Sequence, residues 1–228
     1  NTGFGLLAST SIAPGDLETL QRNLVLSHAC GVGPWLSANV TRLLMVLKIA
    51  SLARGASGVR PVVVEALVGA LKAGALPVVP AKGSVGASGD LAPLAHMTAA
   101  LMGFGEIRIA GETLPAAAGL KRSGLEPLAL GAKEGLALIN GTDGMLGQLI
   151  LALTDLDTLV TTADLTTAMT VQALCGIDAV FAPDLQALRP HEGQKLSAAN
   201  IAALLKDSPL IQAGKSEESK RVQDAYSL

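Results

Sequence analysis

The sequence predicts a mainly α-helical protein with one small hairpin. Hydrophobic residues make up 50% of the 228 residues, but aromatic residues make up only 2%. An apolar fraction of Ala, Leu, Val and Ile favours closely packed helices, because sheet proteins draw more on aromatic and β-branched side chains. Apolar residues also recur at helical spacing along much of the chain. A chain of this length buries a sizeable core, in one large domain or two small ones.

Each predicted helix is bounded by residue types that start or stop helices. Asp16 stands at an N-cap position, Pro61 opens a first turn, and Gly31 and Gly74 end helical runs. In chain order, the helical stretches predicted in this way are 17–29, 40–53, 61–72, 91–102, 133–181 with a break at 140–142, and 196–205.

The remaining segments are predicted to connect these helices. Residues 76–90 form a long connection of small residues, and the alternating pattern of residues 106–114 predicts the hairpin. The chain turns polar and irregular from Lys206. We expect two helical regions, residues 1–130 and 131–228, with no obvious linker between them.

Charge and hydropathy exclude some classes of protein. A net charge of -2 argues against a nucleic-acid partner, since such proteins carry a basic face. The mean hydropathy of +0.46 would suit a membrane protein, but Glu65 and Lys72 interrupt the apolar stretch 62–79, so it is not a run of about 18 uncharged apolar residues. We therefore expect no membrane partner, and extra apolar surface buried in a homo-oligomer.

The cysteines and histidines limit the chemistry further. Cys30 and Cys175 are too few for a disulfide scaffold, so the sequence favours the reducing cytoplasm. The three histidines are dispersed and lack the spacing of metal ligands, so we expect no metal.

The segment 83–96, GSVGASGDLAPLAH, is the one that indicates chemistry. It is not a phosphate-binding P-loop, because Lys82 precedes its glycines instead of following them. It is not a hydrolase nucleophile elbow, because Ser88 is followed two residues later by Asp90 rather than by glycine. The glycine count alone favours a flexible loop before a helix, with Asp90 as N-cap and Pro93 in the first turn.

The order Ala87-Ser88-Gly89 permits a more specific chemistry. The amide nitrogen of Gly89 can attack the carbonyl carbon of Ala87 and close a five-membered ring, and only glycine at the third position avoids a Cβ clash. Loss of water from the ring and of the Ser88 hydroxyl as a second water leaves a methylidene-imidazolone, which is an electrophile. The positive end of the helix that begins near Leu91 would stabilise electron density pushed into it.

This segment resembles the signature of the aromatic amino acid lyases that depend on 4-methylidene-imidazole-5-one (MIO), a family of histidine, phenylalanine and tyrosine ammonia-lyases and some aminomutases. Further stretches resemble blocks of the same family in the same order: NTGFG (1–5), RGASGVR (54–60), KEGLALINGT (133–142) and VQDAYSL (222–228). The resemblance implies an almost entirely helical bundle and a homotetramer. Residues 1–130 would then carry the MIO-forming loop, and residues 131–228 would start the central bundle of long helices.

The resemblance also implies site residues. The MIO group would form from Ala87, Ser88 and Gly89, and Asn140 would support the ring and the bound amine by hydrogen bonding. Without the family, the pair Asn140-Gly141 is better interpreted as a turn.

A second implied group lies at the end of the sequence. Gln223 and Tyr226 match family positions that line the site, which implies a substrate-binding role for Gln223 and a catalytic role for Tyr226. Ala225 stands where many relatives have proline. In isolation these residues would indicate little.

The pair Ser27-His28 falls where family members choose among substrates. A lone histidine there would ordinarily be a cation near a helix C-terminus. Tyrosine-specific members tend to have His-Leu at these positions and phenylalanine-specific members Phe-Leu, whereas Ser-His resembles the histidine-specific form. His96, the last residue of the segment 83–96, is expected to be a structural hydrogen-bonding residue.

The implied activity is that of a carbon–nitrogen lyase that releases ammonia from L-histidine, or a similar aromatic amino acid, and in the first case gives urocanate. An aminomutase, a tyrosine or phenylalanine lyase, and a catalytically inactive helical module stay open as alternatives. By the family pattern, the catalytic base precedes Asn1 and an arginine for the substrate carboxylate follows Leu228. We therefore expect this chain to be an internal piece of a longer protein and to be inactive alone.

Overall fold

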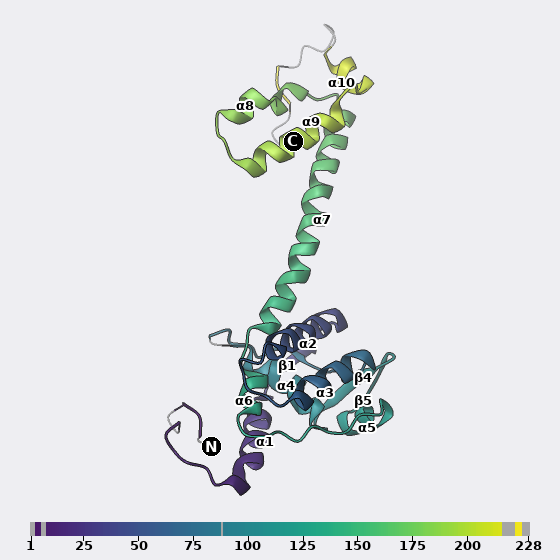
Figure 1. Ribbon diagram of the computed structural model, residues 1–228. Coiled ribbons are helices and arrows are strands. Elements are labelled where there is room, and N and C mark those ends of the chain that lie inside the picture. Colours follow the sequence, from purple (N-terminus) through teal and green to yellow (C-terminus); the bar gives the residue numbers. More distant parts are fainter. Residues whose placement is uncertain (1–2, 6–7, 88, 216–221, 225–228) are drawn as a thin grey trace. The chain divides into compact units, whose positions relative to one another are not determined.

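The computed structural model describes residues 3–5, 8–87, 89–215 and 222–224 (Figure 1). It divides into two compact units, Asn1–Leu151 and Ala152–Leu228, each with its own hydrophobic core. The prediction of a mainly helical fold is confirmed. A domain boundary near residue 130 stays a prediction.

Most helices of the first unit follow the predicted stretches closely, but η2 and α5 were not predicted. They are η2 (Pro14–Asp16), α1 (Leu17–His28), α2 (Ala38–Ala53), α3 (Pro61–Lys72), α4 (Leu91–Leu101), α5 (Ala116–Arg122), α6 (Glu134–Ile139) and the start of α7 (Asp143–Ala173). The predicted break at residues 140–142 separates α6 from α7. α2 begins two residues before the predicted start, because the Ser37 hydroxyl accepts a hydrogen bond from the Val40 amide at 3.3 Å and caps the helix.

Two small antiparallel sheets accompany these helices. The predicted hairpin is formed by β4 (Glu106–Ile109) and β5 (Glu112–Pro115), and β2 (Leu76–Pro77) extends it in the order β2-β4-β5. Ala110 and Gly111 both have positive φ, as a two-residue hairpin turn requires.

The other sheet pairs β1 (Val32–Trp35) with β3 (Pro80–Lys82). The prediction that residues 76–90 are only a connection was therefore wrong for β2 and β3. Strands of two or three residues carry no periodicity of their own, and they form here because partners distant in the sequence satisfy their backbone groups.

The core of the first unit is built around α4. Its Ala, Leu and Met side chains are buried along nearly the whole helix, and it contacts α1 and α6. Small residues let the neighbouring helices approach closely, which is what an aromatic-poor, Ala-rich sequence provides. This packing fixes the start of α4, which lies within the signature segment 83–96.

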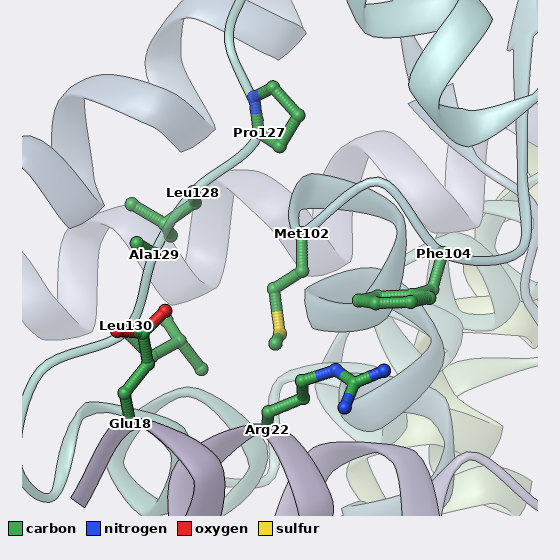
Figure 2. Close-up of a pocket in the computed structure, with 8 residues that line it drawn as sticks. All are labelled: Glu18, Arg22, Met102, Phe104, Pro127, Leu128, Ala129 and Leu130. Atoms are coloured by element: carbon green, nitrogen blue, oxygen red, sulfur yellow. The ribbon is translucent and has the colours of Figure 1, made fainter. Parts of the chain in front are cut away.

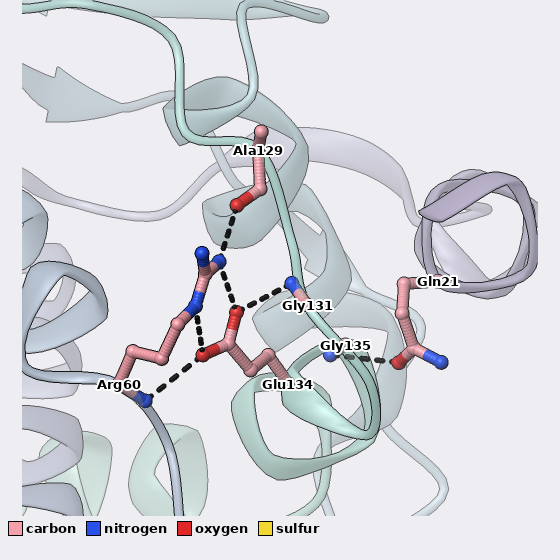
Figure 3. A network of polar contacts seen from close by, with 6 residues as sticks. All are labelled: Gln21, Arg60, Ala129, Gly131, Glu134 and Gly135. Carbon is pink, nitrogen blue, oxygen red and sulfur yellow. Dashed lines mark hydrogen bonds and ion pairs between the residues drawn. The ribbon is translucent and has the colours of Figure 1, made fainter. Parts of the chain in front are cut away.

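A buried carboxylate ties three segments of the first unit together (Figure 3). Glu134, at the start of α6, accepts two hydrogen bonds from the Arg60 guanidinium at 2.9 and 2.7 Å and one from the Gly131 amide at 2.6 Å. Burial raises the pKa of Glu134, but the hydrogen bonds and charge of Arg60 and the Gly131 amide outweigh it, so the pKa lies below its usual value. Arg60 also donates to the Ala129 carbonyl at 2.7 Å, which fixes the segment before α6.

The second unit contains the rest of α7 and shorter helices. These are η3 (Asp178–Phe181), α8 (Pro183–Ala187), α9 (Glu192–Leu205) and α10 (Pro209–Gly214). α10 lies where the sequence predicted irregular chain. It is short, and Ser208 caps it by accepting a hydrogen bond from the Ile211 amide at 3.5 Å.

The stretch Glu134–Ala173 has the length and hydropathy of a helix that could cross a membrane, and 28% of its most apolar window is buried. Bundle helices of soluble proteins meet the same two criteria. Asp155, Asp157 and Asp164 lie along α7, and Oδ2 of Asp164 accepts a hydrogen bond from the side-chain Nδ2 of Asn200 at 2.9 Å. Carboxylates are costly inside a bilayer, so they favour a helix covered by protein over one that spans lipid.

Candidate active site

The loop between β3 and α4 is held at its base by the segment that follows α1. A Cβ at Gly83 would lie 3.0 Å from the Cα of Gly31, so these two backbones are in close contact. The Gly31 amide donates a hydrogen bond to Nε2 of His96 at 3.0 Å. Burial lowers the pKa of His96, which favours the neutral ring that can accept this bond. The prediction that His96 is a structural hydrogen-bonding residue is confirmed.

The structure brings Gly89 and Asn140 together. A Cβ at Gly89 would lie 2.8 Å from Oδ1 of Asn140 and 2.9 Å from the Gly141 nitrogen, and the φ angle of Gly89 is +155°. The next amide, of Asp90, donates to the Gly141 carbonyl at 2.6 Å. Ala87 is exposed, and Ser88 lies outside the described residues. Gly89, the last residue of the Ala87-Ser88-Gly89 triad, is therefore in close contact with the turn between α6 and α7.

Asp90 has a different role from the predicted one. It occupies the N-cap position of α4, but its side chain makes no capping bond to that helix. Instead, Oδ2 accepts the Met145 amide in the first turn of α7 at 2.8 Å, and Oδ1 accepts the Ser84 hydroxyl at 2.5 Å. The carboxylate thus caps a helix distant in the sequence and folds the loop back on itself.

A buried ion pair beside this turn was not predicted from the sequence. Nζ of Lys48 on α2 lies 2.8 Å from Oδ2 of Asp143 on α7, and the two side chains are 2% and 9% exposed. A signal was present, because Leu44, Lys48 and Leu52 are spaced four residues apart and share the buried side of α2.

The Ser27-His28 pair ends α1. Nδ1 of His28 lies 2.8 Å from the Leu24 carbonyl oxygen and 3.2 Å from the Ser27 hydroxyl. A carbonyl oxygen only accepts hydrogen bonds, so Nδ1 carries a proton, and in the neutral form of the ring Nε2 is an acceptor. His28 is half-buried. Gly31, three residues later, contacts Gly83 at the base of the loop between β3 and α4.

The predicted residues near the end of the sequence belong to the second unit. Gln223 is exposed, while Ala225 and Tyr226 lie outside the described residues. Their neighbour Asp224 accepts a hydrogen bond from the Ile177 amide at 2.7 Å, which holds this segment against the end of α7. The roles assigned to Gln223 and Tyr226 stay predictions.

The residues of the first unit fit an MIO group made from the triad. The third residue of such a ring must lack a Cβ, and the contacts of Gly89 leave no room for one. Asn140 provides a side-chain amide at the same place, and α4 begins two residues after Gly89. Among the described residues, no group of three His, Cys, Asp or Glu side chains is placed to hold a metal ion.

A cavity elsewhere in the first unit is separate from these residues (Figure 2). It has a volume of about 250 Å³ and is lined by Glu18, Arg22, Met102, Phe104 and residues 127–130. The Arg22 guanidinium lies 5.0 Å from the centre of the Phe104 ring. None of its lining residues is a predicted site residue, so the cavity does not mark the site of the triad.

The whole chain, residues 1–228, matches the family described as aromatic amino acid lyase, and the chain belongs to this family of carbon–nitrogen lyases. It is 51% identical over 235 residues to the histidine ammonia-lyase of Streptomyces coelicolor, across 100% of this chain and 44% of that protein.

Solved structures agree with this assignment. The phenylalanine aminomutase of Pantoea agglomerans matches with a TM-score of 0.89 and 32% identity, over 100% of this chain and 46% of that one. Histidine ammonia-lyase of Trypanosoma cruzi matches with a TM-score of 0.80 and 36% identity, over 86% and 38% of the respective chains. The chain spans less than half the length of these relatives. The predicted family and the helical fold of its members are confirmed.

Proposed function

We propose that the protein of which this chain is part eliminates ammonia from L-histidine to give urocanate, with an electrophile formed from Ala87, Ser88 and Gly89. The observation that carries the proposal is the packing of Gly89, without room for a Cβ, against Asn140 and Gly141. When formed, the group supplies an electron sink that makes the substrate amine a good leaving group. The resemblance between this chain and a histidine ammonia-lyase supports the same chemistry.

The residues of this chain have separate roles in the proposal. Asn140 would hydrogen-bond the ring and the bound amine, and its Oδ1 lies 2.8 Å from the position of a Cβ on Gly89. Gln223 and Tyr226 line the site around the substrate. A base then removes a proton from the substrate β-carbon, and positioned bases of this kind contribute about 10²–10⁴ in rate.

Substrate choice is assigned to Ser27 and His28. With its Nδ1 proton directed at the Leu24 carbonyl, the neutral form of His28 would offer Nε2 as an acceptor for the N–H of a substrate imidazole. A phenyl or phenol ring has no ring N–H to donate there. This complementarity favours L-histidine over phenylalanine and tyrosine as the substrate.

A homo-oligomer, a tetramer as in the family, is part of the proposal. α7 exposes a stripe of apolar residues at alternating three- and four-residue spacing: Leu146, Leu149, Leu153, Leu156 and Val160. Each of these side chains is 42–52% exposed. Such a stripe is the pattern by which helices pack lengthwise on one another, so we assign it to contacts between subunits in the cytoplasm.

The experiment compares wild type with Ser88→Ala in the protein expressed at its full natural length. Ser88→Ala removes the hydroxyl that must leave as water, so urocanate production, followed by its ultraviolet absorbance, is expected to fall by about 10³-fold or more. Ser51→Ala is the control, because it removes an exposed hydroxyl of α2 outside the loop that carries the triad. Full activity of Ser88→Ala would contradict the proposal.

An aminomutase is the second candidate, and the likeness to the phenylalanine aminomutase of Pantoea agglomerans favours it. Both reactions need the same electrophile, but an aminomutase returns the amine to the neighbouring carbon. Product analysis separates them: the proposal expects urocanate and free ammonia in equal amounts from histidine. A β-amino acid as the main product would replace the lyase with the aminomutase.

A further inference from the structure

The Lys48–Asp143 ion pair is in direct contact with the backbone of Gly141. A Cβ at position 141 would lie 2.7 Å from Nζ of Lys48 and would overlap the Asp143 carboxylate. Both partners stand on helices, Lys48 on α2 and Asp143 in the first turn of α7. The pair therefore fixes where the backbone of this turn can lie.

The same turn contacts the end of the triad. The Gly141 carbonyl accepts the Asp90 amide at 2.6 Å, and its nitrogen would lie 2.9 Å from a Cβ on Gly89. A continuous series of contacts thus connects the ion pair to Gly141 and from there to Gly89. Gly89 carries the nitrogen that must attack Ala87.

The two helices are also packed closely at this point. A Cβ at Gly147 of α7 would lie 3.3 Å from Cβ of Leu43 and 3.4 Å from the nitrogen of Leu44, both on α2. A buried ion pair is weak evidence for stability, because well-packed apolar residues can often replace it at no cost. What an ion pair between two rigid helices does provide is a fixed geometry.

We infer that Lys48 and Asp143 are positioning residues for ring closure at Ala87-Ser88-Gly89, and that they act in making the electrophile rather than in turnover. The inference rests on the proposed function, since it concerns the same group. By holding Gly141, the pair holds the backbone of Gly89 where its nitrogen can reach the Ala87 carbonyl carbon.

The reaction that the pair assists needs no co-reactant. A bond forms between the Gly89 nitrogen and the Ala87 carbonyl carbon, whose oxygen leaves as water with the amide hydrogens of Gly89 and Ser88. The Ser88 hydroxyl then leaves with the Cα hydrogen of Ser88 as a second water. Both steps are losses of water and need no external oxidant or reductant. The rate of ring closure therefore depends on geometry and proton transfers.

Ring closure is measured directly in the protein at its full natural length. Trypsin cuts after Lys82 and Arg108, so the triad lies within the single peptide Gly83–Arg108, which is lighter by two waters once the ring has closed. The test variant is Lys48→Met with Asp143→Asn, which leaves no buried charge unpaired. The closed fraction of the peptide is followed with time after protein synthesis is stopped.

The double variant is expected to fold but to close the ring about tenfold more slowly or worse, because misplacement by about 1 Å can cost about 100-fold in such reactions. In the fraction that does close, the KM for histidine is expected to be unchanged. Leu120→Ala is the control. Leu120 is a buried residue of α5, so its truncation is expected to destabilise the same unit without changing the turn between α6 and α7. It is expected to close the ring at the wild-type rate.

Normal ring closure in the folded double variant would overturn the inference, and so would equally slow closure in Leu120→Ala. If the double variant does not fold, Asp143→Glu keeps the ion pair but displaces the carboxylate by one methylene. Slower closure in that variant supports the inference, and unchanged closure overturns it. A wild-type peptide that never loses the two waters would instead contradict the proposed function.

Discussion

The carboxylate of Asp90 accepts a hydrogen bond from the backbone amide of Met145 at 2.8 Å. Asp90 immediately follows the Ala87-Ser88-Gly89 triad, and Met145 lies in the first turn of α7, 55 residues later. The start of α7 is therefore coupled to the loop that carries the triad. The backbone amide of Asp90 also donates a hydrogen bond to the Gly141 carbonyl. Asp90 therefore contacts the turn before α7 with its backbone and α7 itself with its side chain.

Asp90→Ala is expected to destabilise the protein by about 1–3 kcal/mol, because it leaves the Met145 backbone amide without its acceptor. Asp90 is fully buried, so water cannot readily replace the lost carboxylate. Denaturant unfolding of the variant beside wild type measures the difference. Asp90→Asn keeps an acceptor oxygen and serves as the matched control, with a smaller expected loss; equal stability of wild type and Asp90→Ala would contradict this role.

Gly89→Ala is expected to abolish ring closure. The added Cβ would lie 2.8 Å from Oδ1 of Asn140 and 2.9 Å from the Gly141 nitrogen, and real Cβ atoms essentially never come so close to other atoms. Mass spectrometry of the Gly83–Arg108 peptide then shows the unmodified mass. Gly15→Ala, at a glycine with nothing within 4 Å of the added Cβ, is the control and is expected to leave the ring intact.

The protein is expected to lose stability on acidification because His96 is buried in its neutral form. Burial lowers the pKa of His96, so the folded protein holds the neutral ring while the unfolded chain takes up a proton. The contribution of His96 to the free energy of unfolding is complete above the unfolded pKa of about 6.5. It is lost as the pH falls toward the lower folded pKa, by at most about 1.4 kcal/mol per pH unit. Unfolding free energies at pH 7, 6 and 5 test this, and His96→Gln should reduce the slope; an identical slope in both proteins would refute it.

Glu134→Gln is expected to cost about 1.5–3 kcal/mol, because it removes the charge from a buried acceptor of several hydrogen bonds. The exposed position of Arg60, with 54% of its side chain accessible, keeps the loss at the lower end. Glu112→Gln breaks an exposed ion pair with Arg122 instead and should cost under about 0.5 kcal/mol. A similar loss in both variants, measured by denaturant unfolding, would show that burial of Glu134 is unimportant.

The same carboxylate gives a second pH dependence. The pKa of Glu134 lies below its usual value, so its contribution is present above about pH 4.3, the unfolded pKa, and is lost as the pH falls through the folded one. This window lies below that of His96, so the two effects can be separated by titration. Stability of Glu134→Gln should therefore change less than that of wild type between pH 5 and pH 3.

Replacing Ser27-His28 by the tyrosine-type pair His-Leu is expected to lower kcat/KM for histidine. Loss of the Nε2 acceptor leaves the substrate imidazole N–H unpaired, which costs about 1–3 kcal/mol, or about 5- to 150-fold. Steady-state assays with histidine, tyrosine and phenylalanine on the full-length protein measure the change. A wild-type enzyme that prefers tyrosine or phenylalanine over histidine would contradict the assignment of His28.

Much of the helical architecture could be predicted from the sequence, because the signals are local. Pro61 and Gly74 bound α3, and the break at Asn140-Gly141 separates α6 from α7. β1 and β3 could not be predicted, because each is stabilised by the other across 45 or more residues. α10 was missed because a helix of six residues has too few apolar positions to show a period.

The candidate site, too, could be predicted from the sequence only in part. Ala87-Ser88-Gly89 could be singled out because ring closure depends on the order of three adjacent residues. Asp90 was predicted to cap α4, since an Asp before a helix usually does so, but the fold offers it the Met145 amide instead. Lys48 could have been suspected from its place on the apolar side of α2, but its partner could not.

The sequence by itself determined most of the longer helices, the triad that can cyclise and the family to which the chain belongs, because all three depend on residues that are close together in the sequence. Only the tertiary structure decided that Asn140 and Gly141 press on Gly89, and that Lys48 and Asp143 meet beside them. These contacts join residues 51 to 95 positions apart. They exist because the packing of α2, α4, α6 and α7 brings backbone groups together that no local pattern connects.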